Sequence, residues 1–293
     1  MSDLPRLGFI GIGLMGKPMT LRLLAAGYKV SVWNRSKEKL APVTVKGAVA
    51  KDSPAEVARF ADIVMMCVTD QNSVREVLFG AGGVAEGATE GKIVIDFSSI
   101  APAAARDYAA RLWEKGIGYI DAPVSGGTVG AEQGTLAIMA GGRSEDIEFV
   151  RPLVAELASR FTRMGGSGTG QVTKLANQVI VASLFPVIAE ALRLAEAAGV
   201  DASRLPEALR GGFADSKPLQ VFGPRMASRA YEPALGTVNV MLKDLLNAVA
   251  VAEESGVPLP MARAAVERFR LLVAEGKGET EPSAFIDLLA GGR

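Results

Sequence analysis

A glycine-rich turn near the amino terminus limits the possible folds of this chain more than any other feature. The pattern Gly-x-Gly-x-x-Gly occupies residues 11–16, after a short apolar run, Leu7–Gly11, and at the start of a helical pattern, Met15–Ala26. Glycines in this context allow a tight turn and let the backbone approach a pyrophosphate, which the amino terminus of the helix attracts. The sequence therefore predicts a dinucleotide site. Residues 11–17 also match the beginning of the P-loop motif of NTPases, Gly-x-x-x-x-Gly-Lys. That motif continues with Ser or Thr, whereas this chain has Pro18, so we reject a P-loop.

The residues of the predicted dinucleotide site lie on two turns. The first turn contributes Gly11, Gly13, Leu14, Met15 and Gly16, and the second contributes Asn34, Arg35 and Ser36. NAD sites place Asp or Glu about 20 residues beyond the glycine motif to bind the ribose 2′-hydroxyl. This chain has no carboxylate on the second turn before Glu38, whereas the guanidinium of Arg35 suits a 2′-phosphate and Ser36 adds a hydroxyl and an N–H. We therefore expect NADP(H) to be preferred over NAD(H).

The first part of the chain alternates strand-like and helix-like segments. Several strand candidates are short continuous apolar runs with β-branched residues, which is typical of buried parallel strands. The expected strands are Leu7–Gly11, Val30–Trp33, Ile63–Val68, Ile93–Phe97, Tyr119–Ala122, Leu136–Ala140 and Phe161–Arg163. The expected helices are Met15–Ala26, Pro54–Ala61 with Ser53 as its N-cap, Asn72–Phe79 and Pro102–Lys115. This order predicts an α/β Rossmann domain with a doubly wound parallel sheet over residues 1–166.

Only helical patterns follow the glycine-rich stretch at residues 165–170. We expect helices at Val172–Ala198, Ser203–Arg210, Thr237–Ser255, Met261–Ala274 and Pro282–Leu289, which make an all-α domain over residues 167–293. The first of these helices is apolar nearly all round, so it should be buried between domains or between subunits, and we expect a homodimer or homotetramer. Pro186 inside this helix predicts a kink or a local break.

The composition excludes several classes of function. Lys and Arg number 32, as do Asp and Glu, so no overall charge attracts nucleic acid or an anionic membrane. The chain has no histidine and one cysteine, Cys67, so we expect no metal site and no histidine-dependent mechanism. The longest uncharged stretch of the carboxyl-terminal half, Leu175–Ala189, is too short to span a bilayer. With no signal-peptide pattern at the amino terminus, we expect a cytoplasmic protein.

Four blocks of the sequence resemble the β-hydroxyacid dehydrogenases, the family of 3-hydroxyisobutyrate dehydrogenase, tartronate semialdehyde reductase and the glyoxylate/succinic semialdehyde reductases. The blocks are GFIGIGLMGKPM at Gly8–Met19, DAPVSGGTVGAEQG at Asp121–Gly134, GTGQVTKLANQ at Gly168–Gln178, and Lys243-Asp244. They stand in the family's order, and the combination is specific, although each block alone is not. Many members read Lys-x-x-Asn-Asn in the third block; Gln178 at its end looks more like the tartronate semialdehyde reductase branch.

The resemblance implies a role for particular residues of these blocks. Lys174 would be the catalytic acid/base, with Asn177 beside it, and the active site would lie in the cleft between the two domains. The implied substrate contacts are Ser125, Gly126 and Gly127, which would bind a carboxylate, together with Gln178 and Lys243. The implied cofactor contacts are Val68, Ser99, which matches a Thr at the nicotinamide site, and Lys243, which matches a lysine that reaches the cofactor region.

The residues themselves support an acid/base role for Lys174. A chain without histidine must move protons with another side chain, and Lys174, Asn177 and Gln178 share one face of a helix. A buried polar face is costly unless it is used or satisfied, so a structural cluster that bonds a facing loop is the alternative. Burial and a neighbouring lysine would lower the pKa of Lys174 toward neutrality, where proton transfer is most efficient.

These observations together predict an NADP(H)-dependent oxidoreductase that acts on a small semialdehyde or 3-hydroxy acid bearing a carboxylate. The 6-phosphogluconate dehydrogenases are related but fit less well, because they are longer and use a histidine. Two alternatives of the same fold stay open, an imine reductase and a non-catalytic NADPH-binding module, and the presence of Lys174 argues against both.

Overall fold

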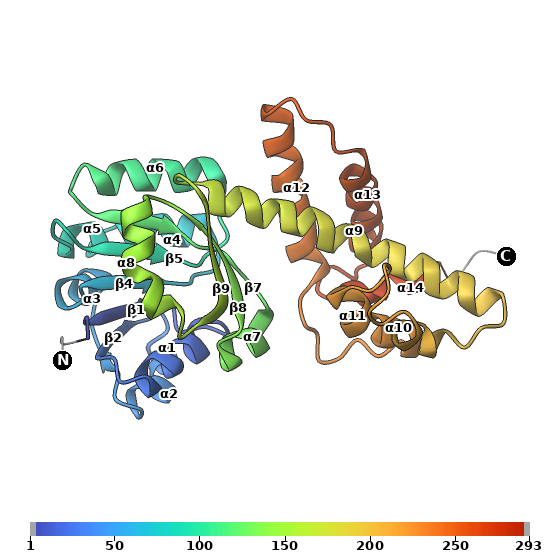
Figure 1. Cartoon of the computed structure of the whole chain (residues 1–293), viewed down its shortest axis with the longest axis horizontal. Coiled ribbons are helices and arrows are strands. Elements are labelled where there is room, and N and C mark those ends of the chain that lie inside the picture. Colours follow the sequence, from blue (N-terminus) through green and yellow to red (C-terminus); the bar gives the residue numbers. More distant parts are fainter. Residues whose placement is uncertain (1–3, 290–293) are drawn as a thin grey trace. The chain divides into compact units, whose positions relative to one another are not determined.

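The computed structural model describes residues 4–289, and the chain divides into two compact units, the first ending at Lys174 and the second beginning at Leu175. The first unit is built on a sheet covered by helices, and the second is entirely helical (Figure 1). The long helix α9 (Thr169–Ala197) starts in the first unit and continues into the second. Because α9 belongs in part to each unit, the predicted domain limits of 1–166 and 167–293 stay a prediction.

The first unit contains a nine-stranded sheet in the order β3-β2-β1-β4-β5-β6-β8-β7, with β9 paired to β8. The strands are β1 (Leu7–Ile10), β2 (Val30–Trp33), β3 (Val49–Ala50), β4 (Ile63–Met66), β5 (Ile93–Asp96), β6 (Gly118–Asp121), β7 (Val124–Ser125), β8 (Leu136–Gly141) and β9 (Ala158–Gly165). The strands from β3 to β6 in this order pair in parallel, and β8 joins β6 antiparallel. The predicted doubly wound parallel sheet is therefore confirmed, and an antiparallel extension adds to it.

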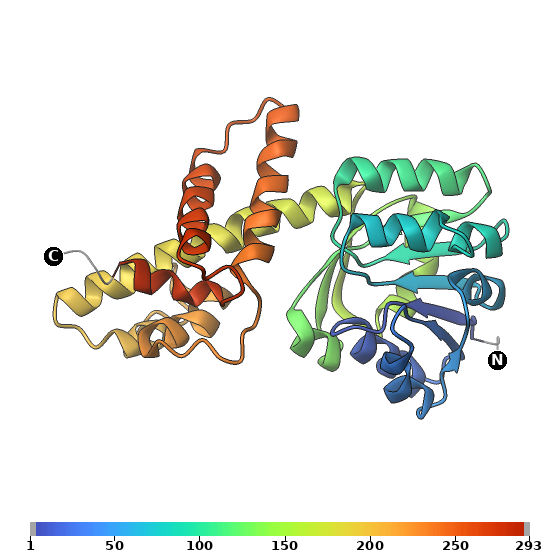
Figure 2. The same ribbon diagram turned by 180° about the vertical axis from the view of Figure 1, so that it is seen from behind.

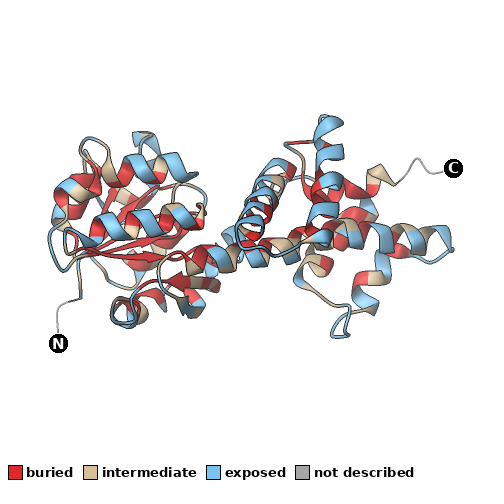
Figure 3. Ribbon diagram, turned by 90° about the horizontal axis from the view of Figure 1, so that it is seen from above, coloured by how far each residue is buried: buried red, intermediate tan, exposed pale blue. Residues whose placement is uncertain are grey.

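The parallel strands are apolar along most of their length because both faces of the sheet are covered. In β4, Ile63 and Met65 belong to one core, and Val64 and Met66 belong to another. Successive side chains of a strand face opposite sides of the sheet, so one strand contributes to both cores. Figure 3 shows the buried strands beneath helices whose outer faces are exposed.

The helices of this unit divide between the two faces. They are α1 (Gly16–Ala25), α2 (Ala41–Thr44), α3 (Pro54–Phe60), α4 (Gln71–Phe79), α5 (Val84–Gly87), α6 (Pro102–Trp113), α7 (Gly127–Gln133) and α8 (Ser144–Val154). Side chains of α1 and α8 fill one core, and those of α3, α4 and α6 fill the other. Ser53 Oγ accepts a hydrogen bond from Glu56 N at 3.2 Å, which confirms the predicted N-cap. The sequence did not predict α7, which contains two glycines, or α8, which contains Pro152.

The second unit packs the carboxyl-terminal part of α9 against shorter helices. They are the 3-10 turn η2 (Ala202–Arg204), α10 (Leu205–Ala208), α11 (Lys217–Ser228), α12 (Val238–Glu254), α13 (Pro260–Ala274), η3 (Pro282–Ala284) and α14 (Phe285–Leu288). Figures 1 and 2 show α12 and α13 side by side. The helical class of this region is as predicted, but α11 was not expected, since Gly223 and Pro224 interrupt its helical pattern in the sequence.

Helix α9 runs without interruption through Pro186, so a local break is wrong, and the kink that was the other predicted outcome stays a prediction. Proline removes one N–H donor from the helix, but the neighbouring Phe185 and Ala189 are 0% exposed and anchor this part of α9 in the core of the helical unit. Length and composition alone would also allow α9 to cross a membrane, and among residues 4–289 no other helix passes that test. The core helix of a globular protein has the same properties.

One face of α9 is apolar and exposed. Ile180, Val187 and Leu194 are 65%, 50% and 73% exposed and lie seven residues apart. With the partly buried Leu184 and the exposed Ala191 between them, they repeat at alternating intervals of four and three residues, which is the spacing of a coiled-coil seam. We call these five residues the α9 seam. The seam supports the prediction that a second copy of the chain covers this helix.

We predict that charges in the α9 seam separate the subunits. The double variant Ile180→Asp/Val187→Asp should be monomeric by light scattering at micromolar concentration, because two carboxylates cannot be buried without partners in a helix interface. The wild-type chain and the control Val45→Asp, in which a valine that is 77% exposed gains the same charge, should both form at least a dimer. A monomeric wild-type chain would contradict the prediction.

Candidate cofactor and active site

The glycine-rich turn connects β1 to α1, and its three glycines meet different steric limits. Gly11 has a φ of +94°, and a Cβ added there would lie 2.2 Å from the carbonyl O of Cys67. A Cβ added at Gly16 would lie 1.9 Å from the carbonyl O of Gly11, whereas one added at Gly13 would meet no atom within 4 Å. The fold itself therefore needs Gly11 and Gly16. At Gly13 the backbone borders open space, which fits the close approach of a pyrophosphate.

The second turn of the predicted cofactor site follows β2 and is bonded to the first through Asn34. The Oδ1 of Asn34 accepts from Ile12 N at 2.9 Å, and its Nδ2 donates to the carbonyl O of Ser36 at 2.9 Å. Asn34 thus fixes the spacing of the two turns. Arg35, between Asn34 and Ser36, is exposed, so its guanidinium is accessible to a ligand.

Val68 and Ser99 follow the carboxyl ends of β4 and β5, which are neighbours in the sheet, and β4 also pairs with β1. Ser98 bonds these two turns together, since its Oγ accepts from Val68 N at 3.0 Å. The predicted cofactor contacts Val68 and Ser99 are therefore held in one hydrogen-bonded layer at the edge of the sheet where α/β proteins bind ligands.

The side chain of Lys174 reaches the turn predicted to bind a carboxylate. Its Nζ donates to the carbonyl O of Val124 at 3.0 Å, and Val124 directly precedes Ser125. Gly126 and Gly127 have φ of 128° and 62°, a region that glycine adopts without steric cost, and both are exposed. The structure thus brings the predicted acid/base next to the predicted carboxylate-binding turn.

Four polar residues of the helical unit form a chain of contacts. Asn177 Nδ2 donates to Gln178 Oε1 at 2.9 Å, and Gln178 Nε2 donates to Asp244 Oδ2 at 2.7 Å. Lys243 Nζ lies 3.4 Å from Asp244 Oδ1. Gln178 and Asp244 are buried, whereas the side chain of Lys243 is 49% exposed. Gln178 therefore fixes the positions of Asn177 and Asp244, and the roles predicted for Asn177, Gln178 and Lys243 toward substrate stay predictions.

A pair of buried carboxylates, not predicted from the sequence, lies at the ends of β5 and β6. Asp96 and Asp121 are register partners and are both 0% exposed. Burial raises the pKa of Asp96 to about 6 and that of Asp121 to about 7. Each strand is apolar until its final Asp, at the edge of the sheet where α/β sites open, and this pattern could have indicated both residues.

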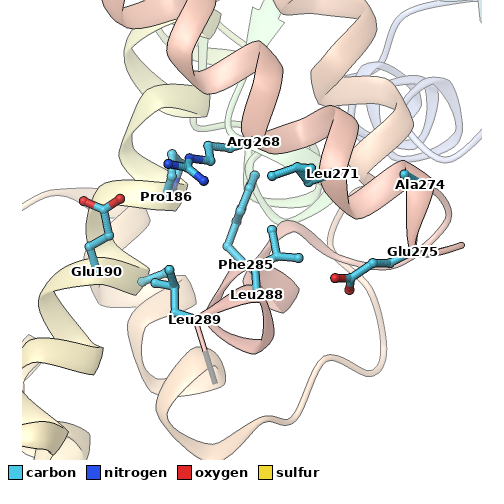
Figure 4. A pocket seen from close by; sticks show the side chains of 10 residues that line it. Pro186, Glu190, Arg268, Leu271, Ala274, Glu275, Phe285, Leu288 and Leu289 are labelled. Atoms are coloured by element: carbon cyan, nitrogen blue, oxygen red, sulfur yellow. The ribbon is translucent and has the colours of Figure 1, made fainter. Parts of the chain in front are cut away.

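The helical unit also contains a separate hollow of about 310 Å³ between α9, α13 and α14 (Figure 4). It is lined by Pro186, Ala189, Glu190, Arg268, Leu271, Ala274, Glu275, Phe285, Leu288 and Leu289. No predicted site residue is among them. In the described part of the chain, no group of three or more His, Cys, Asp or Glu side chains could hold a metal ion.

We predict that Gly13 and Gly16 respond differently to substitution. Gly13→Val should keep the thermal unfolding temperature within a few degrees of wild type and weaken NADPH binding at least about tenfold, because the added side chain fills the space of the pyrophosphate. Gly16→Ala should lower the unfolding temperature, since its Cβ overlaps the Gly11 carbonyl. Fluorescence titration and thermal unfolding measure the two effects. Wild-type NADPH affinity in Gly13→Val would refute the assignment of this turn.

Comparisons with known proteins agree with this geometry. The chain is 39% identical over 288 residues to the 2-hydroxy-3-oxopropionate reductase of Escherichia coli (strain K12), with 97% of each chain covered. A solved structure of Mycobacterium tuberculosis 3-hydroxyisobutyrate dehydrogenase with L-serine has a TM-score of 0.88 at 27% identity, covering 98% of this chain and 99% of that one. Psf3 in complex with NADP+ and 2-OPP has a TM-score of 0.85 at 27% identity, covering 97% and 99%.

Two family models divide the chain between them. The NAD binding domain of 6-phosphogluconate dehydrogenase matches residues 6–166, and the NAD-binding domain of NADP-dependent 3-hydroxyisobutyrate dehydrogenase matches residues 168–289. The resemblance found in the sequence is thereby confirmed. The chain belongs to the 3-hydroxyisobutyrate dehydrogenase family, the NAD(P)-binding dehydrogenases and reductases that act on the CH–OH group of hydroxy acids.

Proposed function

We propose that this chain is an NADP(H)-dependent reductase of a small semialdehyde that carries a carboxylate, similar to 2-hydroxy-3-oxopropionate reductase or to 3-hydroxyisobutyrate dehydrogenase. The observation that carries the proposal is the hydrogen bond from Lys174 to Val124. It holds an ammonium group beside the Ser125-Gly126-Gly127 turn, in the unit that also contains the glycine-rich turn. The family membership supports the same reaction class.

Residues of the first unit and Asn177, which belongs to the second unit, have separate roles in the proposed reaction. Ser125, Gly126 and Gly127 bind the substrate carboxylate through a hydroxyl and backbone N–H groups. This contact fixes the orientation of the carbonyl. When bound, NADPH supplies the hydride for the carbonyl carbon. Lys174, as an ammonium ion, donates a proton to the oxygen that becomes the hydroxyl. Asn177, three residues farther along α9, orients the Lys174 side chain or the substrate hydroxyl.

A panel of small carbonyl compounds tests the proposed function. Oxidation of NADPH is followed with tartronate semialdehyde, methylmalonate semialdehyde, succinic semialdehyde, glyoxylate and a cyclic imine. We expect turnover with at least one semialdehyde and none with the imine. Turnover of the imine alone would identify an imine reductase, and NADPH binding without any turnover would identify a binding module.

Replacement of Lys174 should stop proton transfer without removing the cofactor. Lys174→Ala should lower kcat by roughly 10²–10⁴-fold, the usual contribution of a positioned general acid, while NADPH affinity stays near wild type. Lys92→Ala is a matched control, because Lys92 Nζ also donates to a backbone carbonyl, that of Ala58 at 2.5 Å, and precedes the opposite end of β5. Near-normal kcat in Lys174→Ala would refute the role of this lysine.

Arg35 should determine the choice between NADPH and NADH. A charge-assisted hydrogen bond contributes about 1.5–3 kcal/mol. At about 1.4 kcal/mol per tenfold change, one such bond gives roughly 10–100-fold preference for NADPH in kcat/KM, reduced in part by salt. Arg35→Asp should abolish this preference, because a carboxylate repels the 2′-phosphate and accepts bonds from a free ribose hydroxyl.

The control for Arg35→Asp is Lys39→Asp, which makes the same charge change at an exposed position close by in the chain. It should leave most of the NADPH preference in place when all values are measured at one ionic strength. A wild-type preference for NADH, or an unchanged ratio in Arg35→Asp, would show that the ribose assignment is wrong.

A further inference from the structure

Gln171 connects the first turn of α9 to the turn that follows β5. Its Nε2 donates to the carbonyl O of Ser98 at 2.8 Å, and its Oε1 accepts from Ile100 N at 3.1 Å. These two backbone groups lie on either side of Ser99, so one side-chain amide bonds both peptide groups that flank the predicted nicotinamide contact. Gln171 is only 1% exposed, so water does not compete for these bonds.

The turn around Ser99 is bonded onward to the turn after β4. Ser98 is 2% exposed, its Oγ accepts from Val68 N at 3.0 Å, and its N–H donates to Asp96 Oδ1 at 2.8 Å. Gln171, Ser98 and Val68 are therefore joined by one continuous chain of hydrogen bonds, of which the two made by Gln171 are buried. These bonds link α9 to the Ser99 turn and to the Val68 turn, both of which are predicted to contact the cofactor.

The start of α9 is held by a second set of bonds. Asp121 accepts from Gly168 N at 2.7 Å and from Gln171 N at 3.0 Å. The first N–H groups of a helix have no partner within the helix, so this carboxylate satisfies donors that would otherwise be unpaired. Lys174 lies about one turn farther along α9. The backbone that carries Lys174 is thus fixed to the end of β6, while the Gln171 side chain is fixed to the turn after β5.

We propose that Gln171 is a positioning residue. Its side chain fixes the distance between the Ser99 turn and the turn of α9 that carries Lys174. Through Ser98, it also fixes the position of the Val68 turn. The proposal rests on the proposed function, in which hydride and proton reach the same carbonyl from these two places. Reacting groups must be held close to contact geometry, and a misplacement of about 1 Å can cost about 100-fold in rate. Loss of the amide would also leave the buried carbonyl of Ser98 and the N–H of Ile100 unbonded.

Two substitutions separate positioning from a purely structural role. Gln171→Met keeps the length of the side chain and removes both bonds, and Gln171→Glu keeps an acceptor for Ile100 N but, as a carboxylate, cannot donate to Ser98. The matched control is Gln220→Met, because the Gln220 amide also donates two hydrogen bonds, to the Pro206 carbonyl at 2.6 Å and to Asp215 at 2.7 Å. For each variant we would measure kcat, the NADPH dissociation constant and amide hydrogen exchange at Ile100.

Positioning predicts a loss of kcat with little loss of cofactor affinity. In Gln171→Met, kcat should fall about 10–100-fold while the NADPH dissociation constant changes less than about threefold, and exchange at Ile100 should be faster than in wild type or Gln220→Met. The kcat of Gln171→Glu and its exchange rate at Ile100 should lie between those of wild type and Gln171→Met. If the methionine variant does not fold, the glutamate variant alone tests the proposal. A kcat within about twofold of wild type, or a loss matched by Gln220→Met, would overturn the proposal.

The hydrogen-exchange measurement keeps this proposal distinguishable from the proposed function. If the wild-type protein reduces none of the semialdehydes, the proposed function fails. In that case, faster amide exchange at Ile100 in Gln171→Met still supports the proposal that Gln171 fixes the Ser99 turn. Unchanged exchange at Ile100 would overturn that proposal.

Discussion

The parallel pairing of β1 with both β2 and β4 is the constraint on which the rest of the first unit depends. The chain leaves β1 toward β2 and later returns on the other side of β1 as β4. The loops that follow β1 and β4 therefore lead in opposite directions, and a crevice for a ligand opens between them. The glycine turn, the Arg35 turn, Val68, Ser99 and the turn before Ser125 all follow strand ends, so the sheet alone brings these distant segments to one edge.

Much of this arrangement could be predicted, because the residues that determine it act locally. Strand Val30–Trp33 has the predicted bounds, and the steric limit at Gly16 comes from the carbonyl of Gly11 in the same turn. The unpredicted elements depend on contacts distant in sequence or on weak local patterns. Helix α8 forms despite Pro152, since its apolar residues are buried against the sheet. The partners of Gln171 lie about 70 residues away in the chain, and no spacing rule indicates them.

Because the sequence has no histidine, proton transfer must use another side chain, and Lys174, which is partly buried, is available for it. Lys174 is the proposed proton donor, whereas Asp121 has a fully structural use, accepting two N–H bonds at the start of α9. Burial favours the neutral form of such a carboxyl, and the two N–H bonds favour the charged form. Asp121 therefore fixes the start of α9, about one turn before the proposed proton donor Lys174. Gln171 connects the same part of α9 to the Ser99 turn, which is predicted to contact the cofactor.

The fate of the transferred hydrogen shows whether the proposed site reduces a carbonyl by hydride transfer from NADPH. The wild-type protein is incubated with NADPH carrying deuterium at the transferable position of its nicotinamide and with the semialdehyde that it reduces best. The product is then analysed by mass spectrometry and NMR. Direct hydride transfer should place one deuterium on the carbon that becomes the CH–OH group, with no loss of label to water. Reduced product without deuterium, or label that exchanges into water, would contradict a direct hydride transfer at this site.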